Sequence, residues 1–466
     1  MAEVLWRGDE LAAAVGGRAT AALPDVSGVT FDTREITGGE LFVALRGERD
    51  GHAFVGEAFG RGAAAAMVSR EVGGAGPQIV VDDTLNGLER LGAAARDRSG
   101  AVRCAVTGSV GKTSVTQAIL AGLKRAGRAH GAVKSFNNHI GVPTTLARTP
   151  RETERAVFEI GMNHAGEIAP LSRLVRPQVA VITTVGPVHV ENFPDGETGV
   201  AAEKAAIFAG MEPGGTAVLP RDSRWFDDLA RAALEAGSER VVGFGEHAQA
   251  EARMTGFTPS AAGSQVTAVV AGREVEIALR QSGAHWGPNS LAVLLALEAM
   301  GVDRETALAA LAAFDPLAGR GAEQTLRLAQ GEVRLIDESY NANPLSMAAA
   351  LKSLGARASG GRKIVALTDM LELGGEAPAF HAVIAEQAEA AGVDLVFCAG
   401  IEMKALWDRL ARGRRGAWAP TAVEIAEPLL ATLRDGDVVM VKGSNGSRAS
   451  VITAALRDAA AGGKDG

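Results

Sequence analysis

Short runs of apolar residues alternate with longer helical patterns along most of this chain. Each run is apolar through its full length, which is typical of a strand covered on both faces. The runs predict strands at 29–32, 40–45, 78–81, 103–107, 156–160, 178–184, 216–219, 333–337, 363–368, 394–398 and 437–441. Helical patterns cover the alanine-rich stretch 58–68 and residues 114–123. This alternation predicts an α/β protein whose parallel sheets are covered by helices.

Changes in this pattern divide the 466 residues into three predicted domains. They cover residues 1–84, 85–315 and 316–466. The first boundary falls within 82–87, and the second within 315–320, where Pro316 and Gly319 interrupt a helical pattern. The chain length independently suggests two to four domains.

Composition and charge exclude several classes of protein. With 47 basic and 55 acidic residues the formal charge is −8, so no domain-wide basic field favours nucleic acid as a partner. The two cysteines, Cys104 and Cys398, lie in apolar runs and predict buried free thiols. The N-terminus does not resemble a secretory signal, and the longest apolar stretch, 291–297, is far shorter than the ~20 residues of a membrane helix. We therefore expect a soluble, cytoplasmic protein without membrane insertion.

The strongest chemical signal is the segment TGSVGKTS at 107–114, which follows a predicted strand and opens a predicted helix. In that context, glycines let backbone N–H groups converge on phosphates at a helix N-terminus. Lys112 would reach the β- and γ-phosphates, and the Thr113 hydroxyl would bind Mg²⁺. Val106 stands where the usual consensus has a further glycine, so the loop is a shortened variant. The residues expected to contact ATP here are Gly108, Ser109, Val110, Gly111, Lys112, Thr113 and Ser114. The simpler alternative is a strand–helix turn with an incidental lysine.

Two more polar residues stand at the ends of the following strands. Glu159 ends the strand at 156–160, and His189 comes shortly after the strand at 178–184. Because nucleotides bind at the carboxyl ends of parallel strands, Glu159 is a candidate second metal ligand and His189 a candidate neighbour. The alternatives are a carboxylate that caps a turn and a structural histidine.

These segments resemble the Mur ligases, which build the cytoplasmic peptide precursor of bacterial peptidoglycan. The phosphate loop matches that family's ATP loop, and further matches are SFNNHIGVP at 135–143, FEIGMN at 158–163, GPVH at 186–189 and the pair His285 and Asn289. DESYNANP at 337–344 and DMLELG at 369–374 match the member that adds D-alanyl-D-alanine. FDTR at 31–34, with 39–45 and 50–52, resembles the domain that binds the UDP precursor.

The resemblance implies an ATP-dependent ligase that joins D-alanyl-D-alanine to the carboxylate of UDP-N-acetylmuramoyl-tripeptide through an acyl phosphate. It implies a small α/β domain for the UDP precursor, a central P-loop-type parallel-sheet ATPase domain, and a C-terminal Rossmann-like α/β domain that binds the amine substrate. It also implies ATP and two Mg²⁺ ions as cofactors, small-molecule substrates as the partners, and a monomer. The third residue of the precursor peptide, diaminopimelate or lysine, stays open.

The family's functional residues map onto this sequence as follows. The catalytic residues are Lys112, Glu159, His189 and Lys204, of which Lys204 is the position of an N-carboxylated lysine, and the metal ligands are Thr113, Glu159, His189 and Lys204. ATP contacts beyond the loop are His285, Asn289, Arg320 and Asp337, with Asp337 at the ribose after the first strand of the third domain. Substrate contacts are Asp32, Thr33, Arg34, Asn137, Asn138, Tyr340, Asn341, Asn343 and Lys442.

Several of these assignments have a simpler structural alternative. Lys204 would be an exposed helical lysine, Arg320 a solvated linker charge, and Lys442 a helix-capping group. The sequence Asn-Ala-Asn-Pro at 341–344 is also a good turn and helix entry.

Three other functions compete with the ligase. One is a Mur-type or folylpolyglutamate-type ligase with a different amine acceptor, which the motifs at 340–344 and 369–374 disfavour. Another is a P-loop kinase or switch GTPase, although no guanine-specific Asn-Lys-x-Asp motif follows the loop. The third is a nucleotide-binding module without catalysis.

Overall fold

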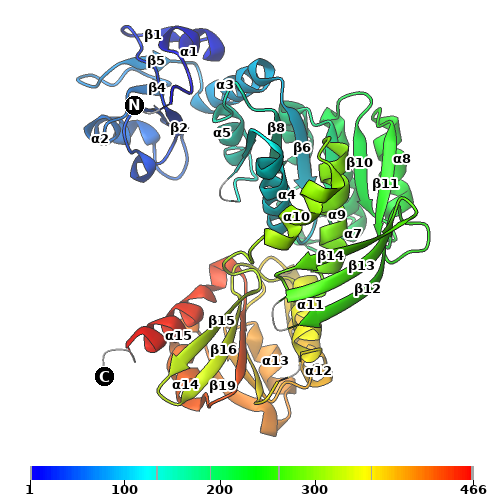
Figure 1. Cartoon of the computed structure of the whole chain (residues 1–466). Helices are drawn as coiled ribbons and strands as arrows, with labels where there is room; N and C mark the ends of the chain where they lie inside the picture. The colour runs from blue at the N-terminus through cyan, green and yellow to red at the C-terminus, as the bar shows by residue number, and fades with distance from the viewer. Residues whose placement is uncertain (1–2, 133–134, 189, 261–262, 358, 463–466) are drawn as a thin grey trace.

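A computed structural model of the chain describes residues 3–132, 135–188, 190–260, 263–357 and 359–462. Within these ranges the strands form three sheets, which occupy residues 18–80, 102–279 and 322–442 in succession. Figure 1 shows the N-terminal unit in blue, the central unit in cyan to green and the C-terminal unit in yellow to red. The mixed α/β architecture predicted from the apolar runs is confirmed.

The N-terminal unit is a small sheet with helices beside it. Its helices and strands are α1 (Gly8–Val15), β1 (Arg18–Ala19), β2 (Gly28–Thr30), β3 (Glu40–Val43), α2 (Val55–Gly60), β4 (Ala65–Val68) and β5 (Gln78–Val80), and α3 (Thr84–Ser99) leads from it to the central unit. The order in the sheet is β1-β5-β4-β3-β2, parallel from β2 to β5, with β1 antiparallel at one edge.

One prediction for this unit is wrong. The stretch 58–68 is not one helix, because α2 ends at Gly60 and residues 65–68 form β4 in the middle of the sheet. Gly62 turns the chain with φ 97°, and every residue of β4 is buried, so the alanines fill both faces of a strand. Within the predicted boundary 82–87, the carboxylate of Asp83 caps α3 by accepting from Asn86 N–H.

The central unit is a larger sheet flanked by helices. Its elements are β6 (Val102–Thr107), α4 (Lys112–Ala126), β7 (Ala129–Gly131), α5 (Gly141–Ala147), β8 (Arg155–Glu159), α6 (Ile168–Val175), β9 (Val179–Ile182), α7 (Glu197–Ala205), β10 (Thr216–Pro220), α8 (Phe226–Glu235), β11 (Arg240–Gly245), β12 (Ala252–Ser260), β13 (Gly263–Val270), β14 (Arg273–Leu279), α9 (Trp286–Ala299) and α10 (Arg304–Ala313).

The strand order of this sheet places β6 between β9 and β8. Among the described residues the order is β14-β13-β12-β11-β10-β9-β6-β8-β7, and β6 pairs in parallel with both β8 and β9. One apolar core packs α4 and α9 against one face, and a second packs α6 against the other. The carboxyl ends of β6, β8 and β9 therefore open at one edge, which is where nucleotide sites form in such sheets.

The antiparallel ribbon β12–β14 was not predicted. Burial alternates along β13 and β14, with mostly polar residues at the exposed positions. Such strands lack the uninterrupted apolar run on which the prediction relied. Figure 1 shows the ribbon extending from the central unit toward the C-terminal unit.

The C-terminal unit is a third layered α/β unit. Its elements are β15 (Ala322–Leu328), β16 (Gly331–Glu338), α11 (Pro344–Gly355), β17 (Lys363–Thr368), α12 (Ala377–Ala390), β18 (Leu395–Ala399), α13 (Met403–Arg409), β19 (Arg415–Ala419), α14 (Ala422–Thr432), β20 (Val438–Lys442) and α15 (Ser450–Gly462). The order is β15-β16-β20-β17-β18-β19, parallel except for the edge strand β15.

The prediction missed the edge strands β15 and β19, which changes the position of one site residue. Asp337 lies inside the second strand, β16, instead of following the first strand of this unit. Asp337 is paired with Ala322 of β15 and with Val441 of β20. Both cysteines are free and buried, as predicted, and burial raises the pKa of each thiol. In the described part of the chain no helix has the length and apolar character needed to cross a bilayer.

Candidate functional site

A cavity of about 1300 Å³ lies between the central and C-terminal units. Most of the predicted site residues line it: Ser109, Val110, Gly111, Lys112, Thr113, Ser114, Asn137, Asn138, Glu159, His285, Asn289, Arg320, Tyr340, Asn341, Asn343 and Lys442. Of the described predicted residues, those that do not line it are Gly108, Lys204, Asp337, Asp32, Thr33 and Arg34. His189 lies outside the described residues.

The loop between β6 and α4 has the backbone that a phosphate loop requires. Gly108 and Gly111 have φ values of 147° and 86°, in the region that favours glycine. A Cβ on Gly108 would lie 1.9 Å from Thr183 Oγ1, so a side chain there is excluded. The loop leads directly into α4, whose first N–H groups have no helical partners and can bind an anion.

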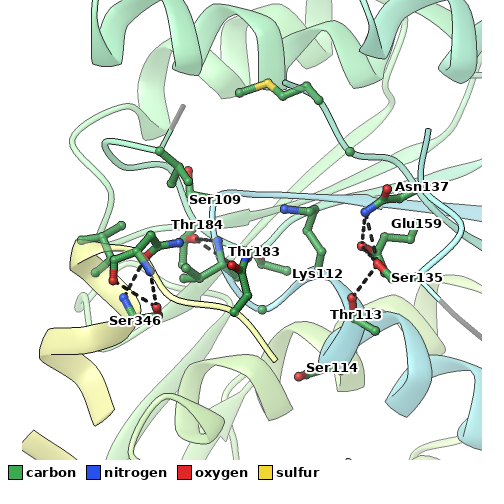
Figure 2. A pocket seen from close by; sticks show the side chains of 18 of the residues that line it. Ser109, Lys112, Thr113, Ser114, Ser135, Asn137, Glu159, Thr183, Thr184 and Ser346 are labelled. Atoms are coloured by element: carbon green, nitrogen blue, oxygen red, sulfur yellow. Dashed lines mark hydrogen bonds between the residues drawn. The ribbon is translucent and has the colours of Figure 1, made fainter. Parts of the chain in front are cut away.

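Lys112 lies inside this loop. Its Nζ donates a hydrogen bond to the carbonyl oxygen of Gly108 at 2.7 Å. Burial lowers the pKa of Lys112, the nearby Glu159 carboxylate opposes that effect, and Arg320 adds to it. Figure 2 shows Lys112 between the Thr183–Thr184 segment and the group formed by Thr113, Ser135 and Glu159.

The segment after β9 holds the loop in place. The carbonyl of Thr184 accepts from the backbone N–H of Ser109 at 2.9 Å, and the Thr184 hydroxyl accepts from Val110 N–H at 3.1 Å. The Ser109 hydroxyl donates to the Gly186 carbonyl and accepts from the Gly186 N–H, both at 3.0 Å. The segment at the end of β9 therefore fixes the phosphate loop, which follows the end of β6.

Oxygen atoms from three segments meet beside Lys112. Thr113 Oγ1 lies 3.2 Å from Ser135 Oγ, and Ser135 donates to Glu159 Oε1 at 3.0 Å. Asn137 Nδ2 donates to the same carboxylate oxygen at 2.7 Å. Thr113 and Glu159 are thus brought together as predicted. Ser135, which joins them, belongs to the SFNNHIGVP segment, but no role was predicted for it.

Arg320 reaches this group from the connection between the central and C-terminal units. Its guanidinium donates to Thr113 Oγ1 at 3.0 Å and lies 3.9 Å from the centroid of the Tyr340 ring. Arg320 is therefore not a solvated linker charge. Tyr340 is 39% exposed, so the stack leaves part of the ring facing the cavity.

The opposite wall of the cavity comes from the C-terminal unit. Lys442 Nζ donates to the carbonyl of Asn341 at 3.0 Å and forms an ion pair with Glu338 at 3.4 Å. Asn343 caps α11 by accepting from Ser346 N–H at 2.9 Å, with a reciprocal bond from Asn343 N–H to the Ser346 hydroxyl. The segment 341–344 therefore forms a turn and helix entry and also lies on the cavity wall, so both interpretations of it hold.

His285 and Asn289 stand at the start of α9. His285 is the N-cap residue, and desolvation lowers its pKa. Asn289 is buried beside the phosphate loop, and a Cβ on Gly111 would lie 3.3 Å from its side-chain amide. The Trp286 ring between them is 2% exposed and packs on Phe314 at a centroid distance of 5.7 Å.

Lys204 is buried, which excludes the interpretation as an exposed helical lysine. It lies on α7 with 2% exposure. Its Nζ lies 3.9 Å from Met162 Sδ, and burial together with the nearby Lys112 lowers its pKa well below the usual value. Such a lysine is held as a neutral amine far more readily than a surface lysine.

Asp337 points away from the cavity. Its carboxylate accepts from the backbone N–H and hydroxyl of Ser339, at 3.1 and 2.6 Å. The other oxygen pairs with Arg457 of α15 at 2.7 Å, and the side chain is 3% exposed. In this structure Asp337 fixes the turn that leads to Tyr340.

The predicted precursor residues lie in the N-terminal unit. Asp32 caps the 3₁₀ turn Thr33–Glu35 and pairs with Arg34 at 2.6 Å. Thr33 donates to Glu57 at 3.1 Å. Phe31 contacts Phe136 of the segment that carries Asn137, with a centroid distance of 6.1 Å, so this unit packs beside the cavity without lining it at these three residues.

Comparisons with known proteins identify the family. Residues 106–297 match the model of the Mur ligase middle domain, and residues 324–445 match that of the Mur ligase, glutamate ligase domain. The UDP-N-acetylmuramoyl-tripeptide–D-alanyl-D-alanine ligase of Escherichia coli (strain K12) is 34% identical over 432 residues, covering 92% of this chain and 93% of that protein. This chain belongs to the Mur ligase family.

Solved structures agree with this assignment to the Mur ligases. A structure of MurF from Acinetobacter baumannii superposes with a TM-score of 0.85 at 26% identity, covering 97% of this chain and 99% of that one. MurF from Thermotoga maritima in complex with ADP gives a TM-score of 0.78 at 22% identity, with 93% and 98% covered, and shows the shared fold. The resemblance inferred from the motifs is confirmed, and the kinase and GTPase alternatives are excluded.

Proposed function

We propose that this Mur ligase joins D-alanyl-D-alanine to UDP-N-acetylmuramoyl-tripeptide, with ATP as the energy source. The E. coli and Bacillus subtilis relatives named for this reaction are each 34% identical to the chain. The observation that carries the proposal is one cavity lined both by the phosphate loop and by the segments 340–346 and 371–373. ATP and an amine can therefore meet in one cavity.

The reaction has two steps. The terminal carboxylate of the tripeptide attacks the γ-phosphorus of ATP, which releases ADP and leaves an acyl phosphate. The amine of the dipeptide then attacks the acyl carbon, and phosphate leaves as the new amide forms. The first step brings anions together, so the protein has to supply positive charge and fixed geometry.

Lys112 and Arg320 supply that charge. Lys112 lies within the phosphate loop, and Arg320 reaches the loop from the C-terminal side through Thr113. The free N–H groups at the start of α4 point at the same place. Together they would hold the γ-phosphate and stabilise the charge that develops on it.

The residues around Thr113 suit Mg²⁺. In the described ranges no three His, Cys, Asp or Glu side chains gather. Mg²⁺ prefers oxygen ligands and keeps water and phosphate oxygens, and the Thr113 and Ser135 hydroxyls with the Glu159 carboxylate provide such a set. When bound, Mg²⁺ would neutralise the phosphate oxygens. A second ion, held by His189 and a carboxylated Lys204, is part of this proposal.

Carboxylation of Lys204 is chemically reasonable at its position. A neutral amine attacks CO₂, whereas an ammonium does not, and burial favours the neutral form of Lys204. The product would be a carbamate, whose oxygens suit a magnesium ion.

The unit limits 1–84, 85–315 and 316–466, the cytoplasmic location and the monomeric state stay parts of the same proposal. So do the roles of Asp32, Thr33 and Arg34 at the UDP precursor. The structure leaves Asp337 without a place in the cavity, and we assign it to the Ser339 turn instead.

Phosphate release tests the proposed reaction. The enzyme is given ATP and UDP-N-acetylmuramoyl-tripeptide, with D-alanyl-D-alanine, glutamate, lysine or diaminopimelate as the amine. We expect release with the dipeptide and its loss in Lys112→Met, while Lys404→Met, at an exposed lysine of α13, keeps it. Release that prefers glutamate or a diamino acid would instead support a ligase with another acceptor.

A further inference from the structure

The segment between β17 and α12 forms part of the cavity wall. Leu371, Glu372 and Leu373 line the cavity, and Glu372 has a positive φ of 63°. The segment crosses from strand to helix through a 3₁₀ turn at Gly374–Glu376. Because it is irregular, side chains have to satisfy its backbone groups, and these side chains then decide its shape.

His381 satisfies the first of these groups. It lies on α12 with 0% exposure. Its Nε2 accepts a hydrogen bond from the Met370 N–H at 3.0 Å, and its Nδ1 lies 2.7 Å from the carbonyl oxygen of Ala377. A carbonyl only accepts, so Nδ1 carries the proton and Nε2 is bare. The imidazole is therefore neutral, and both of its nitrogens are in use.

Ser444 satisfies the next group along the chain. Its hydroxyl accepts from the Leu371 N–H at 3.0 Å and donates to the Ala342 carbonyl at 3.1 Å. Its own N–H donates to the Asp369 carbonyl at 3.2 Å. The Ser444 side chain therefore joins the segment 369–373 to the segment 340–344. His381 binds the neighbouring backbone N–H, that of Met370.

We propose that His381 is a positioning residue for the amine substrate. It does not line the cavity, and it acts by fixing the peptide at Met370, from which Leu371, Glu372 and Leu373 enter the cavity wall. This inference rests on the proposed function, because the dipeptide is the substrate that this wall would contact. Loss of the Nε2 acceptor leaves the Met370 N–H unpaired in a buried place, so the wall shifts and dipeptide binding weakens.

Two amide substitutions separate the two nitrogens of the ring. In His381→Gln the amide reaches the place of Nε2 and can accept from Met370, whereas in His381→Asn it reaches only the place of Nδ1. We expect His381→Asn to raise the KM for D-alanyl-D-alanine about tenfold, as for one lost buried hydrogen bond, with kcat and the KM for ATP within about twofold. His381→Gln keeps the dipeptide KM near the wild-type value.

Gln387→Leu is the matched control. Gln387 lies on the same helix, and its buried Oε1 has no partner among the described residues. We expect the three KM values of this variant, for D-alanyl-D-alanine, ATP and UDP-N-acetylmuramoyl-tripeptide, to equal those of the wild type. Equal dipeptide KM values in the Asn and Gln variants, or a parallel change in all three KM values of the Asn variant, would overturn the proposal. Wild-type enzyme without dipeptide-dependent turnover would overturn the proposed function itself.

Amide exchange in the wild-type protein gives a second test that needs no variant. Hydrogen–deuterium exchange resolved along 369–374 should show Met370 and Leu371 protected, because both N–H groups are bound by side chains. Exchange at these two amides as fast as in an unfolded chain would contradict their hydrogen bonds to His381 and Ser444. This test stands even if His381→Asn does not fold.

Discussion

Arg320 donates a hydrogen bond to Thr113 across 207 positions of the sequence, at 3.0 Å. Thr113 lies in the first turn of α4, the helix that follows the phosphate loop, and Arg320 belongs to the connection that leads into the C-terminal unit. The contact therefore brings a second positive charge to the place where Lys112 lies. It also joins the connection to the C-terminal unit directly to the start of α4.

Substitution of Arg320 should impair catalysis without unfolding the protein. Arg320→Ala removes the guanidinium from Thr113 and from the Tyr340 ring, and we expect kcat to fall by about 100-fold because the phosphoryl charge loses a partner. Arg320→Lys keeps the charge but loses the planar stack, so its kcat should lie between those of the wild type and Arg320→Ala. Steady-state kinetics measures both.

Arg327→Ala provides the control for that series. Arg327 is 82% exposed in its side chain and pairs with Glu332 on the edge hairpin of the same unit. Its removal should leave kcat unchanged. If Arg320→Ala retained wild-type kcat, the role given to the Arg320–Thr113 contact would be wrong.

Glu159 should be needed for magnesium-dependent turnover. Glu159→Gln keeps the shape of the side chain and the contacts from Ser135 and Asn137 but removes the charge. We expect kcat to drop about 1000-fold and the Mg²⁺ concentration for half-maximal activity to rise. Ser135→Ala, which leaves the carboxylate in place, should have a smaller effect. A magnesium titration of the three proteins distinguishes these outcomes, and equal curves would contradict the assignment.

Lys204 should carry a carbamate in the active protein. With ¹³C-labelled bicarbonate, the wild type is expected to show a carbamate carbon signal by NMR that Lys204→Arg lacks. Removal of bicarbonate should lower the activity of the wild type, because a buried amine cannot replace a magnesium-binding carboxylate. Activity that does not respond to bicarbonate in either protein would exclude the modification.

His130 should make the folded protein less stable in mild acid. Burial lowers its pKa from 6.5 to about 4 while its ring contacts the Thr145 carbonyl. In this pH range His130 binds a proton in the unfolded chain but stays neutral in the folded one. The free energy of unfolding therefore falls as the pH drops from above 6.5 toward 4. Between pH 7 and pH 5 the wild type should lose about 2 kcal/mol more than His130→Gln.

Denaturant unfolding at the two pH values measures that difference. The same substitution at His247, which is exposed, serves as the control and should behave like the wild type. If His130→Gln lost the same stability as the wild type between pH 7 and pH 5, His130 would not be the group responsible.

Apolar runs predicted the parallel strands because such strands are buried on both faces. The register of β6 between β8 and β9 then follows from the fold class, and Glu159 arrives at the phosphate loop as a consequence. The strands β13 and β14 were missed because only alternate residues are buried. Residues 65–68 were assigned to a helix because alanine favours helices, although tertiary burial decided for a strand.

Most of the site residues predicted from the sequence line the cavity, but the sequence did not predict the contacts that hold them there. Two motifs place Thr113 at the start of α4 and Glu159 at the end of β8, yet nothing in them shows that Ser135 joins the two residues. The same is true of His381 and Met370, which meet only because α12 packs under the end of β17. Asp337 shows the reverse case, since the pairing with Arg457 of α15 turns a predicted ligand contact into a structural one.

Transfer of an oxygen isotope is the most direct test of whether the tripeptide carboxylate forms an acyl phosphate that D-alanyl-D-alanine then attacks. UDP-N-acetylmuramoyl-tripeptide labelled with ¹⁸O in its terminal carboxylate is incubated with ATP and D-alanyl-D-alanine, and the released phosphate is analysed by mass spectrometry. We expect ¹⁸O from the precursor to appear in the phosphate, and we expect this to require the dipeptide. Released phosphate without the label, or labelled phosphate that forms only with another amine, would contradict the proposed reaction.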